Sequence, residues 1–184
     1  MPANLIAFCV VAVLLRLTTL VISVRHERAL KADGAIEIGA GNSTFLALAH
    51  VLYYVAAIAE SSWFGAIHEG AIQAGAAVYD GITWAGLALY AFGMVMLLVV
   101  IRILGRFWTV KLVIARDHEL VTHPLFRRVR HPNYFLNILP ELVGFALALH
   151  AWWTLVIGLI LYAVPLTIRI RQEEKAMTAK FERY

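Results

Sequence analysis

Residues 130–175 read RHPNYFLNILPELVGFALALHAWWTLVIGLILYAVPLTIRIRQEEK, with two apolar segments between two polar motifs. The segments cover about residues 132–149 and 152–168, close to the length of about 20 residues that crosses a hydrocarbon core of about 30 Å as a helix. Only His150 and Ala151 separate them. This spacing predicts a helical hairpin whose two polar motifs return to the same membrane face.

Three further apolar segments precede the hairpin, at about residues 3–24, 44–64 and 82–101. With 61% apolar and 15% charged residues, the composition excludes a soluble globular domain. Gly86 and Gly93 on the third segment predict close packing against a neighbouring helix. The sequence therefore predicts an all-α integral membrane protein with five transmembrane helices, forming a single domain.

Lys and Arg residues are distributed unevenly over the connections between these segments. The 25–43 connection holds three, the 102–131 connection holds seven and the tail from Arg169 holds five, whereas residues 65–81 and 150–151 hold none. Because Lys and Arg collect in cytoplasmic loops, this distribution predicts an outside N-terminus and a cytoplasmic C-terminus. Both polar motifs of the hairpin would then face the cytoplasm.

Several classes of function are excluded by composition and spacing. The net charge of +4 comes from arginines beside apolar segments, which indicates a membrane surface and not nucleic acid. A single cysteine, Cys9, excludes an intramolecular disulfide and a Cys-rich metal site. The seven histidines show no metal-ligand spacing, and no Rossmann glycine motif is present. No metal and no Rossmann-bound cofactor are expected.

Two polar features lie inside the predicted spans. Arg16 is alone in the first span and is expected to pair with Glu60 or Glu141, because an unpaired intramembrane arginine is costly. Asn133, Asn137 and Glu141 recur at four-residue spacing, so they share one face of a helix. Glu141 is expected either to hold a substrate hydroxyl or to form a buried ion pair with Arg16.

The stretch HELVTHPLFRRVRHPNY, residues 118–134, concentrates polar side chains on the predicted cytoplasmic side. Pro132 suits the first position of the next helix, and a helix N-terminus with free N–H groups suits an anionic ligand group. Arg130 strengthens this preference. Arg127 and Arg128 either strengthen it too or bind only lipid headgroups.

The motif HELVTHPLFRRVRHPNYF, followed one pair of spans later by RIRQEEKAM, resembles the isoprenylcysteine carboxyl methyltransferase family. Its members are integral-membrane enzymes that use S-adenosylmethionine without a Rossmann fold. The N-terminal half is similar to a bacterial subgroup associated with type III polyketide synthases. The resemblance implies an O-methyltransferase of the bacterial inner (plasma) membrane that acts on an alkylpyrone-type lipid or an isoprenylcysteine-like carboxylate. It also implies a type III polyketide synthase as a pathway neighbour.

The resemblance implies that residues 102–184 form a cofactor-binding catalytic half on a three-helix scaffold of residues 1–101. Arg169 is placed on the substrate side, and Asn137 or Glu141 at a second polar group of the acceptor. The resemblance and the helix N-terminus together predict these cofactor-binding residues: His118, Glu119, Leu120, Val121, Phe126, Arg130, His131, Asn133, Tyr134 and Glu173.

Two other functions are kept as alternatives. NADPH-dependent membrane reductases of the sterol and steroid type share an RHPNYF-like motif, but they commonly continue with Gly-Glu where this chain has Leu136 and Asn137. A non-catalytic membrane transporter or scaffold would not need such a density of polar residues on one cytoplasmic face. The methyltransferase is therefore the favoured interpretation.

Overall fold

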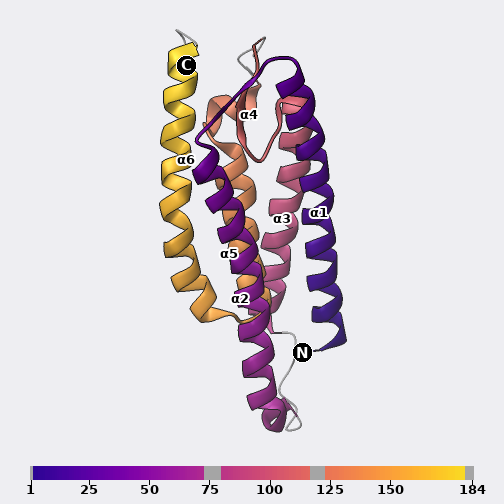
Figure 1. The fold of residues 1–184 in the computed structure, drawn as a ribbon. Helices are drawn as coiled ribbons and strands as arrows, with labels where there is room; N and C mark the ends of the chain where they lie inside the picture. Colours follow the sequence, from indigo (N-terminus) through magenta and orange to yellow (C-terminus); the bar gives the residue numbers. More distant parts are fainter. Residues whose placement is uncertain (1, 73–79, 117–122, 181–184) are drawn as a thin grey trace.

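The computed structural model describes residues 2–72, 80–116 and 123–180. For residues 64–72 only the backbone is described. Helices dominate, and they run up and down along one bundle (Figure 1). The described elements are α1 (Ala3–Ala32), β1 (Ile36–Ile38), α2 (Ala40–Ile72), α3 (Gly81–Leu104), the 3-10 turn η1 (Gly105–Phe107), β2 (Leu112–Ile114), α4 (Pro124–Arg128), the π-helical turn η2 (Asn133–Ile138), α5 (Leu139–Ala148), the π-helical turn η3 (Thr154–Gly158) and α6 (Leu159–Lys180).

Four helical segments of the described chain are long and apolar enough to cross a membrane: Ala3–Ala32, Ala40–Trp63, Gly81–Phe107 and Thr154–Lys180. The remaining predicted span corresponds to the shorter apolar helix Asn133–Ala148, which covers about 24 Å at 1.5 Å per residue. The prediction of a helical membrane protein is thus confirmed, with four helical segments long and apolar enough to cross the membrane. Five spans and their orientation stay predictions. The start of α1 and the end of α6 lie at opposite ends of the bundle (Figure 1).

Glycines bring α3 and α5 into backbone contact. A Cβ added to Gly86 would overlap the backbone of α5, and one added to Gly144 would lie 2.7 Å from the carbonyl oxygen of Gly86. A Cβ at Gly93 would lie 3.0 Å from the backbone nitrogen of Glu141. Small residues allow membrane helices to approach this closely. The packing role predicted for Gly86 and Gly93 is confirmed.

The predicted hairpin is present, with a tight turn between α5 and η3. His150 has a φ of 53°, and the Ala151 N–H donates to the Ala146 carbonyl at 2.9 Å. This left-handed residue with its backward hydrogen bond is the usual way to end a helix sharply. Both arms of the hairpin begin with a π-helical turn. In the first arm, Pro140 has no N–H and cannot donate the backbone hydrogen bond that a regular α-helix would form at this position, next to the π-helical turn.

Glu60 of α2 caps the second arm of this hairpin. Its carboxylate accepts hydrogen bonds from the backbone nitrogens of Trp153 and Thr154, both at 2.8 Å. A carboxylate at a helix start satisfies N–H groups that have no partner within the helix. Glu60 is therefore engaged by η3, and it is not the partner of Arg16.

The all-α prediction holds for the fold as a whole, and a short two-stranded antiparallel ribbon is added to it. β1 and β2 pair with Ile36 opposite Ile114, so the two predicted cytoplasmic connections are joined to each other. Gly34 and Gly39, with φ values of 83° and 63°, let the chain turn at both ends of β1. The runs IEI and LVI favour strands, but three residues are too few for an alternating pattern to be recognised.

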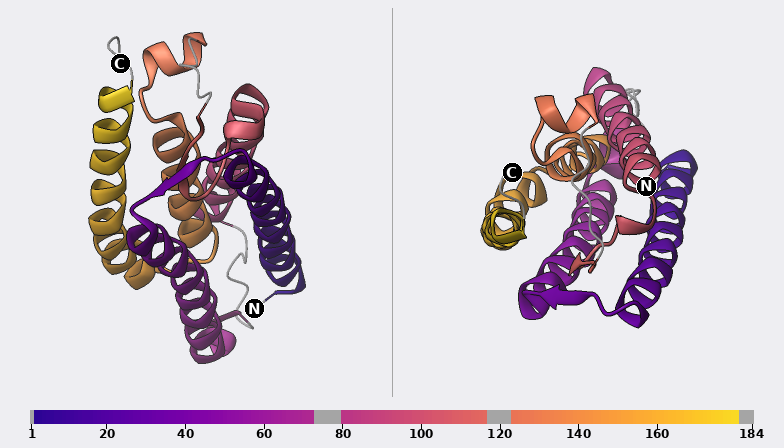
Figure 2. Two further views of the ribbon diagram at one scale, coloured as in Figure 1. Left: turned by 45° about the horizontal axis from the view of Figure 1, so that its top comes forward. Right: turned by 90° about the horizontal axis from the view of Figure 1, so that it is seen from above.

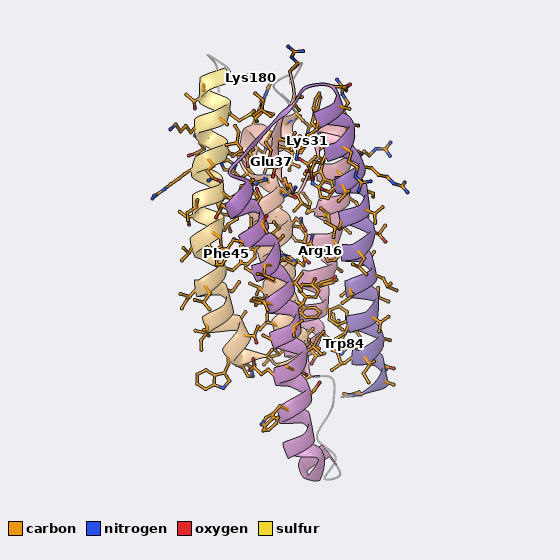
Figure 3. The ribbon with its side chains drawn as sticks, in the orientation of Figure 1. Arg16, Lys31, Glu37, Phe45, Trp84 and Lys180 are labelled. Atoms are coloured by element: carbon orange, nitrogen blue, oxygen red, sulfur yellow. The ribbon has the colours of Figure 1, made fainter. Side chains whose placement is uncertain are left out.

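Charged side chains hold this ribbon to α1. The Lys31 ammonium lies 2.7 Å from the Glu27 carboxylate and also contacts Glu37, while Lys111 lies 2.8 Å from Glu27. Figure 3 shows Lys31 and Glu37 close together at the end of the bundle where α6 also ends. Lys180 of α6 donates to the carbonyl of Arg116 at 3.1 Å. The ribbon is thus attached to the first and the last helix.

Replacing Gly144 with Ala should destabilise the bundle. The added methyl would overlap the backbone of Tyr90, and overpacking of this kind costs about 1–3 kcal/mol, more than the gain of about 1 kcal/mol in helix propensity. The measurement is the melting temperature of the purified protein in detergent. Gly41→Ala is the matched control, because nothing lies within 4 Å of its Cβ position. Equal melting temperatures for the two variants would contradict the close packing of α3 and α5.

Candidate functional site

A polar cluster joins the start of η2 to the last turns of α6. The Tyr134 hydroxyl donates to the Glu173 carboxylate at 2.5 Å, and Arg169 Nε donates to the Tyr134 oxygen at 3.2 Å. His131 and Glu174 complete the group. These residues come from the two polar motifs at either end of the hairpin. The prediction that the two motifs meet is confirmed.

His131 lies between two carboxylates. Its Nδ1 is 3.4 Å from Glu173 and its Nε2 is 3.4 Å from Glu174, and its ring stacks on Tyr134 with centroids 5.8 Å apart. Burial opposes the positive charge, but the two carboxylates together outweigh burial and hold the pKa of His131 above its usual value of 6.5. The site therefore favours a protonated imidazole.

Arg169 ties three segments together and is only 3% exposed. Besides its bond to Tyr134, its Nη1 donates to the Ser43 hydroxyl at 2.5 Å and its Nη2 to the Val110 carbonyl at 2.8 Å. These bonds connect α6 to the start of α2 and to the segment before β2. The substrate role of Arg169 stays a prediction, and the structure adds that its guanidinium already holds three oxygen atoms.

Three members of this site were missed by the sequence reasoning. Ser43 stands in a polar connection without a recognisable motif, and Val110 contributes only its backbone carbonyl, which no side-chain pattern reveals. Glu174 follows Glu173 directly. The two adjacent glutamates could have indicated that Glu174 also belongs to the site, because neighbouring carboxylates can lie on either side of one cationic group.

The other predicted cofactor residues are placed less centrally. Arg130 is exposed, with Nη1 4.0 Å from the Glu174 carboxylate. Asn133 accepts a hydrogen bond from Asn137 at 3.2 Å. Phe126 is half-buried on α4, and within the described ranges it makes no ring contact with this cluster. The predicted residues His118, Glu119, Leu120 and Val121 lie outside the described residues.

A second polar cluster is centred on Glu141, which has no exposed surface. Its carboxylate forms an ion pair with Arg16, accepts a hydrogen bond from the Tyr54 hydroxyl at 2.5 Å and lies 3.3 Å from His50 Nε2. Of the two alternatives predicted for Glu141, the buried ion pair is present. A substrate hydroxyl would have to displace one of these partners to reach the carboxylate.

The chemistry of the first cluster suits a ligand that carries both charges. Glu173 and Glu174 offer partly exposed carboxylates, with side chains 27% and 42% accessible, beside the Arg130 guanidinium and beside His131, whose pKa is raised. Throughout the part of the chain that the structure describes, no group of His, Cys, Asp and Glu is arranged to hold a metal ion. A small zwitterionic ligand therefore matches the site.

The fold and the site define an integral membrane protein with a polar site at one end of its helices. Residues 86–179 match the model of the Isoprenylcysteine carboxyl methyltransferase (ICMT) family. The chain belongs to this family, and the match supports a membrane methyltransferase. The matched region includes α3 from Gly86 onward and the hairpin as far as residue 179, with the Glu173 motif.

Two relatives extend the likeness to the N-terminal half. An uncharacterized protein of Haemophilus influenzae is 43% identical over 178 residues, covering 97% of this chain and 96% of the relative. The uncharacterized protein YpbQ of Bacillus subtilis is 27% identical over 175 residues, covering 88% of this chain and 89% of the relative. No solved structure matches. The N-terminal helices are thus shared with relatives and are not an addition peculiar to this chain.

Replacing His131 with Gln should make stability less dependent on pH. Because the pKa of His131 is raised above 6.5 in the folded protein, its contribution to stability is fully present below pH 6.5 and is lost as the pH rises through the folded value. The melting-temperature difference between wild type and His131→Gln should therefore be larger at pH 6 than at pH 9. Tyr134→Phe, which keeps the imidazole, should retain the wild-type pH dependence. A difference that grows with pH would contradict the assigned protonation.

Proposed function

We propose that this protein is an S-adenosylmethionine-dependent O-methyltransferase whose acceptor is a lipophilic molecule with an acidic oxygen. The observation that carries the proposal is the meeting of His131 and Tyr134 with Glu173, 3.4 Å and 2.5 Å apart, in a chain of this methyltransferase family. The family's dependence on S-adenosylmethionine supplies the cofactor.

The residues of the first cluster fit this cofactor. Glu173 and Glu174 would hold its ammonium group or ribose hydroxyls, while His131 and Arg130 would hold its carboxylate. When bound, S-adenosylmethionine would supply an electrophilic methyl group on a positively charged sulfur.

The protein's own task is mainly positioning and desolvation. A carboxylate or an acidic enol is already ionised near neutral pH, so no strong base has to remove a proton from the acceptor. Arg169 is a buried cation directly beside Tyr134, where it would attract and orient the ionised oxygen. Its bonds to Ser43 and Val110 keep the guanidinium in one orientation.

The acceptor reaches this site from the membrane. The outer faces of the helices are apolar, with large exposed side chains such as Val10, Val55 and Ile160, so a lipophilic tail can remain among the lipids while its polar end is bound. An alkylpyrone-type lipid or an isoprenylcysteine-like carboxylate meets these requirements. The first acceptor would come from a type III polyketide synthase. The site would face the cytoplasm from the bacterial inner membrane.

Replacing Glu173 with Gln should weaken the binding of S-adenosylmethionine about 10- to 100-fold, which corresponds to the loss of one hydrogen bond to a charged group. The measurement is titration calorimetry of the purified full chain in detergent. Glu37→Gln is the matched control, because this carboxylate lies in the ribbon at the same end of the bundle. Unchanged affinity in Glu173→Gln would overturn the cofactor site.

Membranes containing the protein should transfer labelled methyl groups from S-adenosylmethionine to a component of a bacterial lipid extract. Alkaline hydrolysis then separates the products, because it releases the label from a methyl ester and leaves it on an enol ether. Arg169→Met should transfer little label, since the cation beside the acceptor is lost. Oxidation of NADPH without methyl transfer would instead support the membrane-reductase alternative.

A further inference from the structure

Two polar layers cross the interior of the helix bundle. Arg169 and Tyr134 form the first layer, and Tyr162, His50 and Glu141 form the second, with His50 Nδ1 3.4 Å from the Tyr162 oxygen. The layers are separated by seven residues both on α6 and along η2 and α5. At 1.5 Å per residue, this separation is about 10 Å along the bundle.

The second layer has an accessible side. Glu141 is completely buried, but the side chains of Arg16 and His50 are 21% and 16% exposed. Arg16 directs Nε and Nη2 to Glu141, and within the described ranges its Nη1 has no hydrogen-bond partner. Figure 3 places Arg16 between α1 and α2, which stand apart in both views of Figure 2. The Arg16 side chain, 21% exposed, is within reach of a molecule from the membrane.

The net charge of the layer formed by Arg16, His50 and Glu141 determines which kind of ligand group can bind beside it. Lipid tails offer no acceptor to the Arg16 Nη1 donors, so an oxygen atom is needed there. Arg16 and Glu141 already neutralise each other. A further anion would leave a net negative charge in a low-dielectric interior, whereas an uncharged keto or hydroxyl oxygen would not.

Asn137 continues the polar path between the two layers. It is 1% exposed, and its amide nitrogen donates to Asn133 at 3.2 Å. Its oxygen finds no donor among the residues that the structure describes. A buried acceptor without a partner is costly, so a donor group of a bound molecule beside Asn137 would be favourable.

We propose that Arg16 forms a second subsite, which binds an uncharged keto or hydroxyl oxygen in the lipophilic part of the acceptor. This oxygen lies about 10 Å from the one that is methylated, as the spacing of the two layers requires. Glu141 is a positioning residue that holds Arg16 and His50 in place. The inference rests on the proposed function, and it adds a preference for acceptors that are oxygenated along the tail.

The test compares two probes, octadecanoic acid and 10-oxooctadecanoic acid, by titration calorimetry of the full chain in detergent. The wild type should bind the keto acid about tenfold more tightly, the effect of one hydrogen bond to a charged donor. In Arg16→Met/Glu141→Leu, which removes both charges together and so leaves no unpaired ion, the two acids should bind equally.

Equal affinities in the wild type, no binding of either acid, or a tenfold preference that survives in the double variant would each overturn the subsite. The melting temperature shows whether the double variant is folded. If it is not, Arg16→Lys serves instead, because it keeps a cation opposite Glu141 and removes the Nη1 donor, and it should reduce the preference at least threefold. Binding of S-adenosylmethionine to the wild type is measured separately, and its absence would refute the proposed function without changing the comparison of the two acids.

Discussion

A carboxylate with no exposed surface among apolar helices needs a cation and hydrogen-bond donors. Glu141 of α5 meets this requirement with Arg16 of α1 and with His50 and Tyr54 of α2. Removing one partner of such a pair would leave an uncompensated charge in the bundle interior. The positions of α1 and α2 relative to α5 are therefore constrained by electrostatics as well as by apolar packing. The glycine contacts between α3 and α5 add a steric constraint on the other side.

The polar site at the end of the bundle is built from segments far apart in the chain. Arg169 holds α6 to the start of α2 through Ser43 and to the segment before β2 through Val110. The ribbon of β1 and β2 joins the two connections that carry these residues. The N-terminal helices thus contribute directly to the surroundings of Tyr134 and Glu173. A strict division into a scaffold and a catalytic half understates this contribution.

This arrangement suits the charged cofactor and the lipophilic acceptor that we propose. The partly accessible carboxylates of Glu173 and Glu174 are at one end, beside the buried His131, whereas the flanks of α1, α2 and α6 expose large apolar side chains. In the proposed reaction, the cofactor and the acceptor would approach from these two directions and meet near Arg169. Family membership agrees with this division, because it supports a membrane methyltransferase.

Hydropathy, loop charge and the two-residue turn at His150 were sufficient to predict the helices and the meeting of His131 with Glu173, because these features depend on neighbours along the chain. The sequence did not decide whether Arg16 pairs with Glu60 or with Glu141. Glu141 is 125 residues away, and a separation of that size along the chain does not indicate how close two side chains lie in the fold. The ribbon was missed because its strands are three residues long. The sequence by itself therefore determined the helical hairpin and its polar ends. Only the tertiary structure decided the ion pair, the ribbon and the three oxygens around Arg169, because each of them joins segments that only packing brings together.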